Sequence, residues 1–315
     1  MKITVPCFAK LNLDLRVLNR RPDGFHELRT IFQTISLKDQ LSIEFEAANR
    51  TQINLSSSID IEDNLVVRAA KLILDRLRVS AWVRFTLSKR IPMGAGLGGG
   101  SSDAAAVLIA LTALTGKEIA FPELVRFAES LGSDVPFFLY GGTALGLGRG
   151  TELYPLPDQP PRPALVVTSG VHVSTAEAYR LLRRDVTNAL TSPAESPILR
   201  EFQTIVWTLA GSNQSVLDLD RLPLRNDFED AVFGMHKELA AAARKLRRFG
   251  ARPALMTGSG SAIFGLFRTD AEARAAGGKF PAGNTFPVHF VTRRQYRSLW
   301  RRSLGPVAAR SCFCD

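Results

Sequence analysis

The sequence predicts a two-domain α+β protein, and three observations support this. Stretches in which polar and apolar residues alternate, as in β-strands, are interleaved with apolar helical stretches along most of the chain. The 315 residues are 45% hydrophobic and 22% charged, which is enough for a large core divided between two domains. The Pro-rich segment 154–163 is typical of a linker. We therefore expect domains over residues 1–155 and 160–290, followed by a basic tail over 291–315.

The N-terminal stretch has the two-residue period of a strand. Its leucines fall on one face, and Lys10, Asn12 and Asp14 fall on the other. Half-exposed strands are common, so the residues alone favour solvent for this polar face and leave a functional site as the alternative.

The remaining elements follow from periodicity and capping residues. A turn at residues 21–24 precedes Phe25 and His26, and Asp63-Asn64 are placed to cap a helix that reaches Arg78. Strands are expected at 40–46, 81–89, 164–169, 257–264 and 285–292, and helices at 121–132, 236–250 and 271–279.

The strongest functional signal is the stretch IPMGAGLGGGSSD at residues 91–103, called the glycine loop below. Five of residues 94–100 are glycine, which lets backbone amides turn toward an anion. Ser101, Ser102 and Asp103 then open an apolar helix that stops at Gly116. A phosphate here would meet free N–H groups and the positive end of a helix dipole. The sequence therefore predicts a phosphate site.

Three other interpretations of the glycine loop were weighed. A dinucleotide-binding fold requires a strand running into the first glycine and an acidic residue at the end of a second strand, but residues 89–92 intervene and Glu118 follows a helix. A Walker loop requires Gly-Lys-Ser/Thr, which is missing. A flexible linker is not normally followed by a capped apolar helix.

Composition limits the partners and the compartment. The N-terminus lacks a signal-peptide core and no apolar run is long enough to span a membrane, so a cytoplasmic protein is expected. Three cysteines give no disulfide framework. The formal net charge of +10 raises nucleic acid as a partner, but the tail carries six arginines against one aspartate, so half of the net charge lies there and no nucleic-acid partner is expected.

One further acid stands out. Ser133 and Asp134 precede the apolar run VPFFLY. An acid in this position is either a turn former or a carboxylate held against a dry pocket.

Together these segments resemble a known kinase superfamily. The stretches AKLNL, RPDGFHEL, EDNLVVRAA, SKRIPMGAGLGGGSSDAA, GSDVPFFLYGG, NDFE and MTGSGSAIF are similar to the superfamily of galactokinase, homoserine kinase, mevalonate kinase and phosphomevalonate kinase (GHMP). Within it they look like the 4-diphosphocytidyl-2-C-methyl-D-erythritol kinases of the non-mevalonate isoprenoid pathway. The resemblance extends to about residue 290.

The resemblance implies a fold and an activity. The fold would be an N-terminal nucleotide-binding α/β domain, a C-terminal ferredoxin-like α+β domain and a cleft between them. The activity would be ATP-dependent phosphorylation of the 2-hydroxyl of the cytidyl diphosphate alcohol. A homoserine or mevalonate kinase is the nearest alternative, and GFHEL argues against it. A dehydrogenase and a nucleic-acid-binding module are the more distant alternatives.

The resemblance also implies site residues. Asp134 would orient or deprotonate the alcohol, and Lys10 would stabilise developing negative charge. His26 would read the cytosine edge, and Phe25, where the family commonly has Tyr, could still stack on the base. Magnesium should accompany ATP, near Ser101 or Ser102, although the resemblance does not fix its ligands. The nucleotide positions implied are Asn64, Lys89, Pro92, Met93, Gly94, Ala95, Gly96, Leu97, Gly98, Gly99, Gly100, Ser101 and Ser102, and the substrate positions are Asn12, Phe25, His26, Thr175 and Tyr179.

Overall fold

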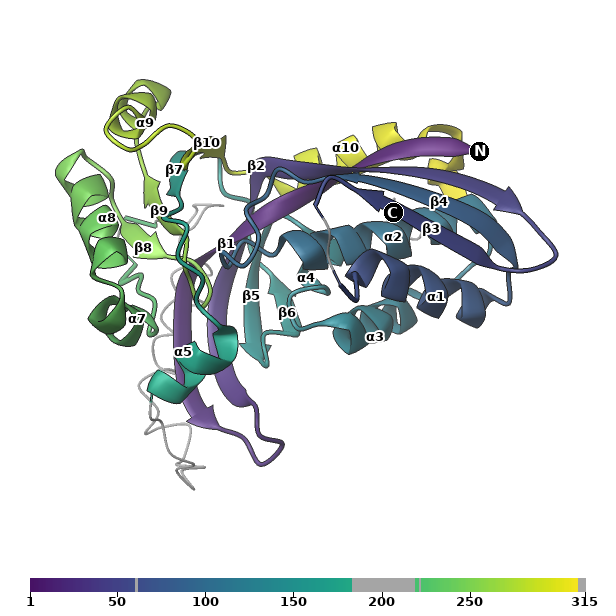
Figure 1. Cartoon of the computed structure of the whole chain (residues 1–315), viewed down its shortest axis with the longest axis horizontal. Coiled ribbons are helices and arrows are strands. Elements are labelled where there is room, and N and C mark those ends of the chain that lie inside the picture. The colour runs from purple at the N-terminus through teal and green to yellow at the C-terminus, as the bar shows by residue number, and fades with distance from the viewer. Residues whose placement is uncertain (60–61, 183–218, 221, 311–315) are drawn as a thin grey trace.

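The computed structural model describes residues 1–59, 62–182, 219–220 and 222–310. Within these ranges the strands form two sheets, one in each half of the molecule (Figure 1). The first sheet has the order β3-β4-β2-β5-β6, with β1 paired to β2. Its strands are β1 (Lys2–Arg20), β2 (His26–Ala47), β3 (Gln52–Ser57), β4 (Ala81–Ser88), β5 (Thr143–Gly148) and β6 (Glu152–Pro155).

A long antiparallel hairpin connects the two halves. Strands β1 and β2 have 19 and 22 residues and pair from Lys2↔Glu44 at one end to Arg20↔His26 at the other. One end of the hairpin lies in the first sheet, and the other extends beside α5 of the second half (Figure 1). The β1 residues that alternate with the leucines are therefore placed between the two halves.

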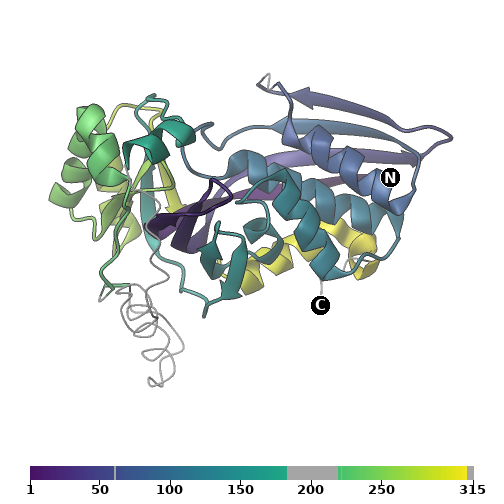
Figure 2. The ribbon, with the colours of Figure 1, turned by 90° about the horizontal axis from the view of Figure 1, so that it is seen from below.

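A helical layer covers one face of the first sheet (Figure 2). Its central helix α2 is buried without interruption from Ser102 to Leu114, as expected for a helix that is apolar all round. The helix begins at Gly99, two residues before the predicted start, and no side chain caps it. The layer contains α1 (Leu65–Leu77), α2 (Gly99–Thr115), α3 (Phe121–Leu131) and the short α4 (Phe137–Tyr140).

The second sheet has the order β10-β7-β9-β8. The predicted single strand through 257–264 is wrong, because residues 257–262 turn between β8 and β9, which pair antiparallel. This turn carries the TGSGS sequence back toward the first half. The elements of this half are β7 (Pro163–Val167), α5 (Thr175–Leu181), α7 (Glu229–Met235), α8 (Lys237–Arg248), β8 (Ala254–Met256), β9 (Ile263–Leu266), α9 (Asp270–Gly277) and β10 (Thr285–His289).

The expected basic tail is folded onto the first half over residues 293–310. It forms α10 (Arg293–Leu304) and a 3₁₀ turn at Gly305–Arg310. Tyr296 and Trp300 are each 1% exposed and belong to the core of the first half. They lie one helical turn apart, so one apolar stripe faces the core while the arginines cover the rest of the helix.

Several sequence expectations are confirmed by the local geometry. The Asn64 side chain caps α1, accepting a hydrogen bond from the Val66 N–H at 2.9 Å, and α2 ends at a left-handed Gly116.

Cys7 is buried, whereas Cys312 and Cys314 lie outside the described residues. Within the described ranges, no helix combines the length and the apolar character needed to cross a membrane.

Candidate active site

A cavity of about 1070 Å³ lies at the junction of the two halves. We call it the junction cavity. It brings together predicted site residues that are far apart in the sequence: Lys10, Asn12, Phe25, His26, Gly94, Gly96, Ser101, Asp134, Thr175 and Tyr179.

Lys10 and Asp134 form an ion pair in this cavity. The Lys10 ammonium lies 3.2 Å from the Asp134 carboxylate and donates a hydrogen bond of 2.6 Å to the Asn12 side-chain oxygen. The Lys10 side chain is 3% exposed, whereas that of Asp134 is 35% exposed. The lysine is therefore fixed within the protein, while the carboxylate stays accessible to a bound molecule. The polar face of β1 is therefore buried and is not a solvated surface.

Asn12 links this pair to the second half. Its backbone N–H donates to the Thr257 hydroxyl at 2.9 Å, and its side-chain amide donates to the Thr30 hydroxyl at 2.8 Å. Asn226, of the NDFE sequence, donates from its side chain to the carbonyls of Met256 and Gly258, each at 2.8 Å. These bonds hold the TGSGS turn against β1.

The glycine loop packs against the TGSGS turn of the second half. Gly96 has φ +76°, and a Cβ there would stand 2.2 Å from the Thr257 carbonyl oxygen. Gly98 has φ +71°, and a Cβ there would stand 2.9 Å from the Phe138 ring and 3.1 Å from the Lys10 side chain. Both positions therefore require glycine for backbone conformation and for space.

The other loop residues divide into anchors and exposed positions. Ala95 and Leu97 are buried in the apolar cluster between the halves, whereas Met93 is 52% exposed. Ser101 lines the junction cavity. Ser102 is 2% exposed, and its hydroxyl has no hydrogen-bond partner.

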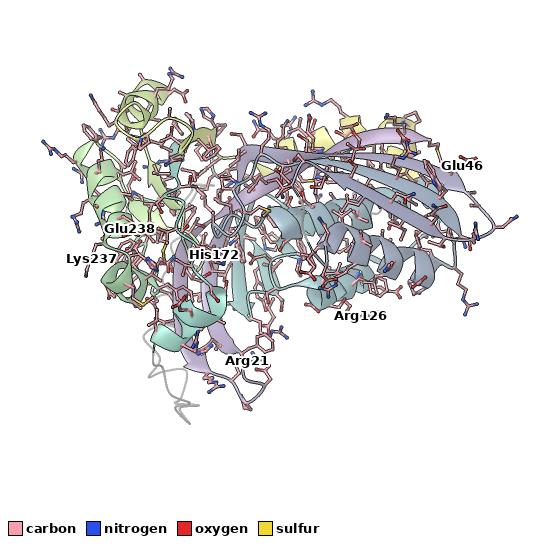
Figure 3. The ribbon with its side chains drawn as sticks, in the orientation of Figure 1. Arg21, Glu46, Arg126, His172, Lys237 and Glu238 are labelled. Atoms are coloured by element: carbon pink, nitrogen blue, oxygen red, sulfur yellow. The ribbon has the colours of Figure 1, made fainter. Side chains whose placement is uncertain are left out.

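His172 approaches the glycine loop from the second half (Figure 3). A Cβ on Gly94 would lie 2.8 Å from its Nδ1 atom. The adjacent Val171 carbonyl accepts a hydrogen bond from the Ser261 hydroxyl, and the Thr175 and Ser259 hydroxyls are 3.0 Å apart. Sequence reasoning did not identify His172, because a lone histidine outside the recognisable motifs carries no signal.

Aromatic rings gather at the far end of the junction cavity. The His26 and Tyr179 rings stack with centroids 4.5 Å apart and an interplanar angle of 19°, and Phe228 meets Tyr179 edge-on. Burial, reinforced by the charge of Asp134, raises the pKa of Tyr179 to about 12. Phe25 is 47% exposed, and the Arg149 guanidinium lies 3.4 Å from its ring centroid. In this structure Tyr179 thus stacks on His26, and Phe25 stacks on Arg149.

Asn64 lies at a different cavity, of about 640 Å³. This cavity is formed by the end of β3 and the start of α1, and it is lined by Leu55, Ser56, Ser57, Ile59, Asp63, Asn64, Val67, Arg68 and Lys71. Lys89, which the resemblance also implied as a nucleotide position, does not line it.

Lys89 is instead buried beneath the glycine loop. Its ammonium lies 2.5 Å from Asp39 and 2.8 Å from Asp103, and its side chain is 3% exposed. Burial opposes its charge, but the two carboxylates outweigh that effect and raise the pKa of Lys89. Burial also raises the pKa of Asp103 to about 6, although Lys89 acts in the opposite direction.

A second buried ion cluster was missed by sequence reasoning. Asp14 accepts hydrogen bonds from Arg16 and Arg29, both at 2.9 Å, and from the Arg225 backbone at 3.0 Å. All three side chains in this cluster are 3% exposed. The local signal was Asp14 with Arg16 two residues along the same face of β1, whereas Arg29 and Arg225 come from other segments that no local pattern links to them.

Comparison with known proteins agrees with this arrangement. Residues 64–142 match the family described as GHMP kinases N terminal domain, and residues 205–283 match GHMP kinases C terminal. A crystal structure of 4-(cytidine 5'-diphospho)-2C-methyl-D-erythritol kinase superposes with a TM-score of 0.72 at 39% identity, covering 92% of this chain and 99% of the other. A homoserine kinase from Cytophaga hutchinsonii superposes with a TM-score of 0.64 at 22% identity, covering 92% and 94% of the two chains, which supports the fold alone.

Curated relatives make the assignment narrower. A 4-diphosphocytidyl-2-C-methyl-D-erythritol kinase from Solibacter usitatus is 52% identical over 298 residues, or 94% of this chain and 91% of the relative. One from Bacillus cereus is 37% identical over 86% of this chain and 90% of the relative. The fold and the site thus define a kinase of the GHMP class. Within that class, the chain belongs to the 4-diphosphocytidyl-2-C-methyl-D-erythritol kinase family.

Proposed function

We propose that this protein transfers the γ-phosphoryl group of ATP to the 2-hydroxyl of 4-diphosphocytidyl-2-C-methyl-D-erythritol. The observation that carries the proposal is the Lys10–Asp134 pair, which lies in one cavity with the glycine loop and with the His26–Tyr179 stack. Their presence in one cavity supports a reaction in which the pair acts on a molecule that contacts both the loop and the aromatic rings. We further propose that the reaction takes place in the cytoplasm.

Lys10 and Asp134 have complementary roles in this reaction. Phosphoryl transfer depends on alignment and on charge stabilisation more than on covalent help from the protein. The accessible Asp134 carboxylate orients the acceptor hydroxyl and takes its proton, while the oxygen bonds to the γ-phosphorus and ADP leaves. The buried Lys10 ammonium then stabilises negative charge on the transferring group.

The glycine loop and the Asn64 cavity are suited to the two ends of ATP. The loop presents backbone N–H groups at the start of α2, where the helix dipole favours anions. The Asn64 cavity lies at the start of α1, and α1 packs on α2. We infer that the phosphates bind the loop and that the adenosine extends toward Asn64.

The site also fits magnesium delivered with ATP. Among the described residues, no group of three or more His, Cys, Asp and Glu side chains could form a metal cage. Magnesium commonly takes most of its ligands from phosphates and water, so one or two protein oxygens suffice. The cavity-lining Ser101 and the unpartnered hydroxyl of Ser102 are the oxygens that would hold it. When bound, magnesium neutralises phosphate charge.

The aromatic end of the junction cavity is the proposed cytidine site. His26 offers a ring nitrogen to the cytosine edge, while Tyr179 and Phe25 offer ring faces. Because Phe25 lacks a hydroxyl, it supplies stacking without a hydrogen bond. Thr175 lies nearer the TGSGS turn and is placed to contact the substrate between the base and the loop.

A coupled assay for ADP release tests the proposed function. The purified chain is supplied with ATP, magnesium and, in turn, the cytidyl substrate, homoserine and mevalonate. Turnover with the cytidyl substrate alone is the expected result. Faster turnover with homoserine or mevalonate would refute the substrate assignment, and no turnover with any of them would refute the kinase assignment.

A further inference from the structure

A buried ion cluster of Lys89, Asp39 and Asp103 lies beneath the glycine loop and lines neither the junction cavity nor the Asn64 cavity. Asp39 is fully buried, and one of its oxygens accepts hydrogen bonds from the Arg90 and Ile91 backbone N–H groups at 2.5 and 2.8 Å. Its other oxygen faces the Lys89 ammonium, which also reaches Asp103 in α2. Hydrogen bonds therefore connect β2, the residues entering the loop and the helix leaving it.

The position of the ammonium relative to the loop backbone is tightly constrained. A Cβ on Gly99 would stand 3.1 Å from Lys89 Nζ and 3.1 Å from the Ile91 side chain. The ammonium thus lies directly under the first turn of α2, on the side facing the core. With both carboxylates as partners and 3% of its side chain exposed, Lys89 has no surface to offer a nucleotide.

The Lys89 main chain also contacts the adjacent strand. Its backbone N–H donates to the Ser58 hydroxyl at 3.0 Å. Ser58 directly follows β3, whose last residues line the Asn64 cavity. One residue therefore joins the wall of the Asn64 cavity to both ends of the glycine loop.

We propose that Lys89, Asp39 and Asp103 are positioning residues that hold the two ends of the glycine loop together, so that its N–H groups converge on the phosphates of ATP. Lys89 acts on the nucleotide through the loop and not by contact. The inference rests on the proposed function in that ATP is the ligand of the loop. It predicts a result that differs from the one expected if Lys89 contacted the nucleotide directly.

The distinguishing consequence is rescue. Removing the ammonium leaves two buried carboxylates facing each other without a cation, which is strongly unfavourable and should push the loop ends apart. Removing the charge of Asp103 as well relieves that repulsion. A lysine that contacts a phosphate directly would show no such rescue, because Asp103→Asn restores nothing to the nucleotide.

The experiment is a double-mutant cycle read by calorimetric ATP affinity, with magnesium present and no acceptor alcohol. We expect Lys89→Gln to weaken ATP binding by at least about tenfold, since a buried ion pair has lost one member. Asp103→Asn alone, whose amide oxygen still accepts from Lys89, should change affinity by less than about fivefold. The double variant should bind within about fivefold of the parent. Lys38→Gln, a neighbour of Asp39 outside both cavities, is the control and should bind as the parent does.

Kinetic measurements separate positioning from loss of the fold. Lys89→Gln should raise the KM for ATP while the KM for the cytidyl alcohol stays near the parental value, and a generally disordered protein would lose both. If Lys89→Gln does not fold, a folded double variant with near-parental ATP affinity still supports the proposal. A folded double variant that binds ATP as weakly as Lys89→Gln overturns it, as does a folded Lys89→Gln with parental affinity. Because calorimetric binding is measured without the acceptor, an incorrect acceptor assignment would change the KM comparison but leave the ATP affinities unchanged.

Discussion

Removing the Trp300 side chain should destabilise the whole protein, although it lies in the segment that the sequence predicted to be a basic tail. Trp300 is 1% exposed and packs beside Tyr296, with ring centroids 6.5 Å apart. A buried Trp replaced by Ala typically costs about 3–5 kcal/mol, through lost transfer energy and the cavity left behind. Native proteins are stable by only about 5–15 kcal/mol, so Trp300→Ala should remove about a fifth of the total or more.

The effect should reach the active site through one hydrogen bond. The Tyr296 hydroxyl donates to the Phe138 carbonyl at 2.6 Å, and the Phe138 ring lies against Gly98 of the glycine loop. Asp134 lies four residues before Phe138, in the turn that leads to α4. A chain ending after Thr292 would therefore lose both a part of the core and the support beneath the turn that carries Asp134, and we expect it neither to fold cooperatively nor to catalyse the reaction.

Urea unfolding monitored by circular dichroism tests this prediction. Arg302→Ala is the matched control on the exposed face of α10 and should change the free energy of unfolding by less than about 0.5 kcal/mol. The reasoning fails if Trp300→Ala is within about 1 kcal/mol of the parent. It also fails if the chain ending after Thr292 folds cooperatively and retains kinase activity.

Four further outcomes are expected. Asp134→Asn should lower turnover by roughly 10²–10⁴-fold with little change in ATP affinity, and turnover within a few-fold of the parent would remove its assignment as base. Gly98→Val should abolish ATP binding, because φ is +71° and the Phe138 ring leaves no room, so normal calorimetric affinity in a folded variant would contradict it. His26→Ala and Phe25→Ala should each weaken the cytidyl substrate by about 1–3 kcal/mol without affecting ATP, and normal kinetics in both would rule out the cytidine site. Burial raises the pKa of Glu229 to about 7, so the folded state binds more protons than the unfolded state between about pH 4.5 and 7. The stability of the fold should therefore decline as pH rises through that window. Glu229→Gln should remove this decline and be more stable than the parent at pH 8 by about 1–3 kcal/mol, whereas parallel pH profiles of the unfolding free energy would contradict the argument.

Local signals in the sequence were sufficient for much of the fold and for the main parts of the site. The capping residue Asn64, the glycine loop and the alternating face of β1 each specify structure within a few residues of themselves. The Lys10–Asp134 pair could not be deduced in this way. Its members are more than a hundred residues apart, and only the family resemblance placed them together.

The charge of a residue was the least reliable guide to whether the segment around it is exposed. Lys89 stands two residues before the glycine loop, but its partners come from β2 and α2, so its burial depends on tertiary packing that no local pattern encodes. The α10 segment shows the opposite case, because its sequence contains a local signal for burial that the surrounding positive charge obscured. Tyr296, Trp300 and Leu304 recur every four residues and mark a buried stripe, but the surrounding arginines dominated the composition.

The two halves must be held at a fixed distance for the proposed chemistry to work, and the contacts that do so are unusually close. Gly96 lies against the Thr257 carbonyl so tightly that no Cβ fits, and the Asn12 backbone donates to the hydroxyl of the same threonine. Asn226 holds the carbonyls on either side of Thr257 and bridges to Leu15 of β1. A displacement of the second half would therefore move Thr257, Asn12 and, through its 2.6 Å hydrogen bond, the Lys10 ammonium. Because misplacement by about 1 Å can cost on the order of a hundredfold in rate, these buried polar contacts matter more for alignment than for stability.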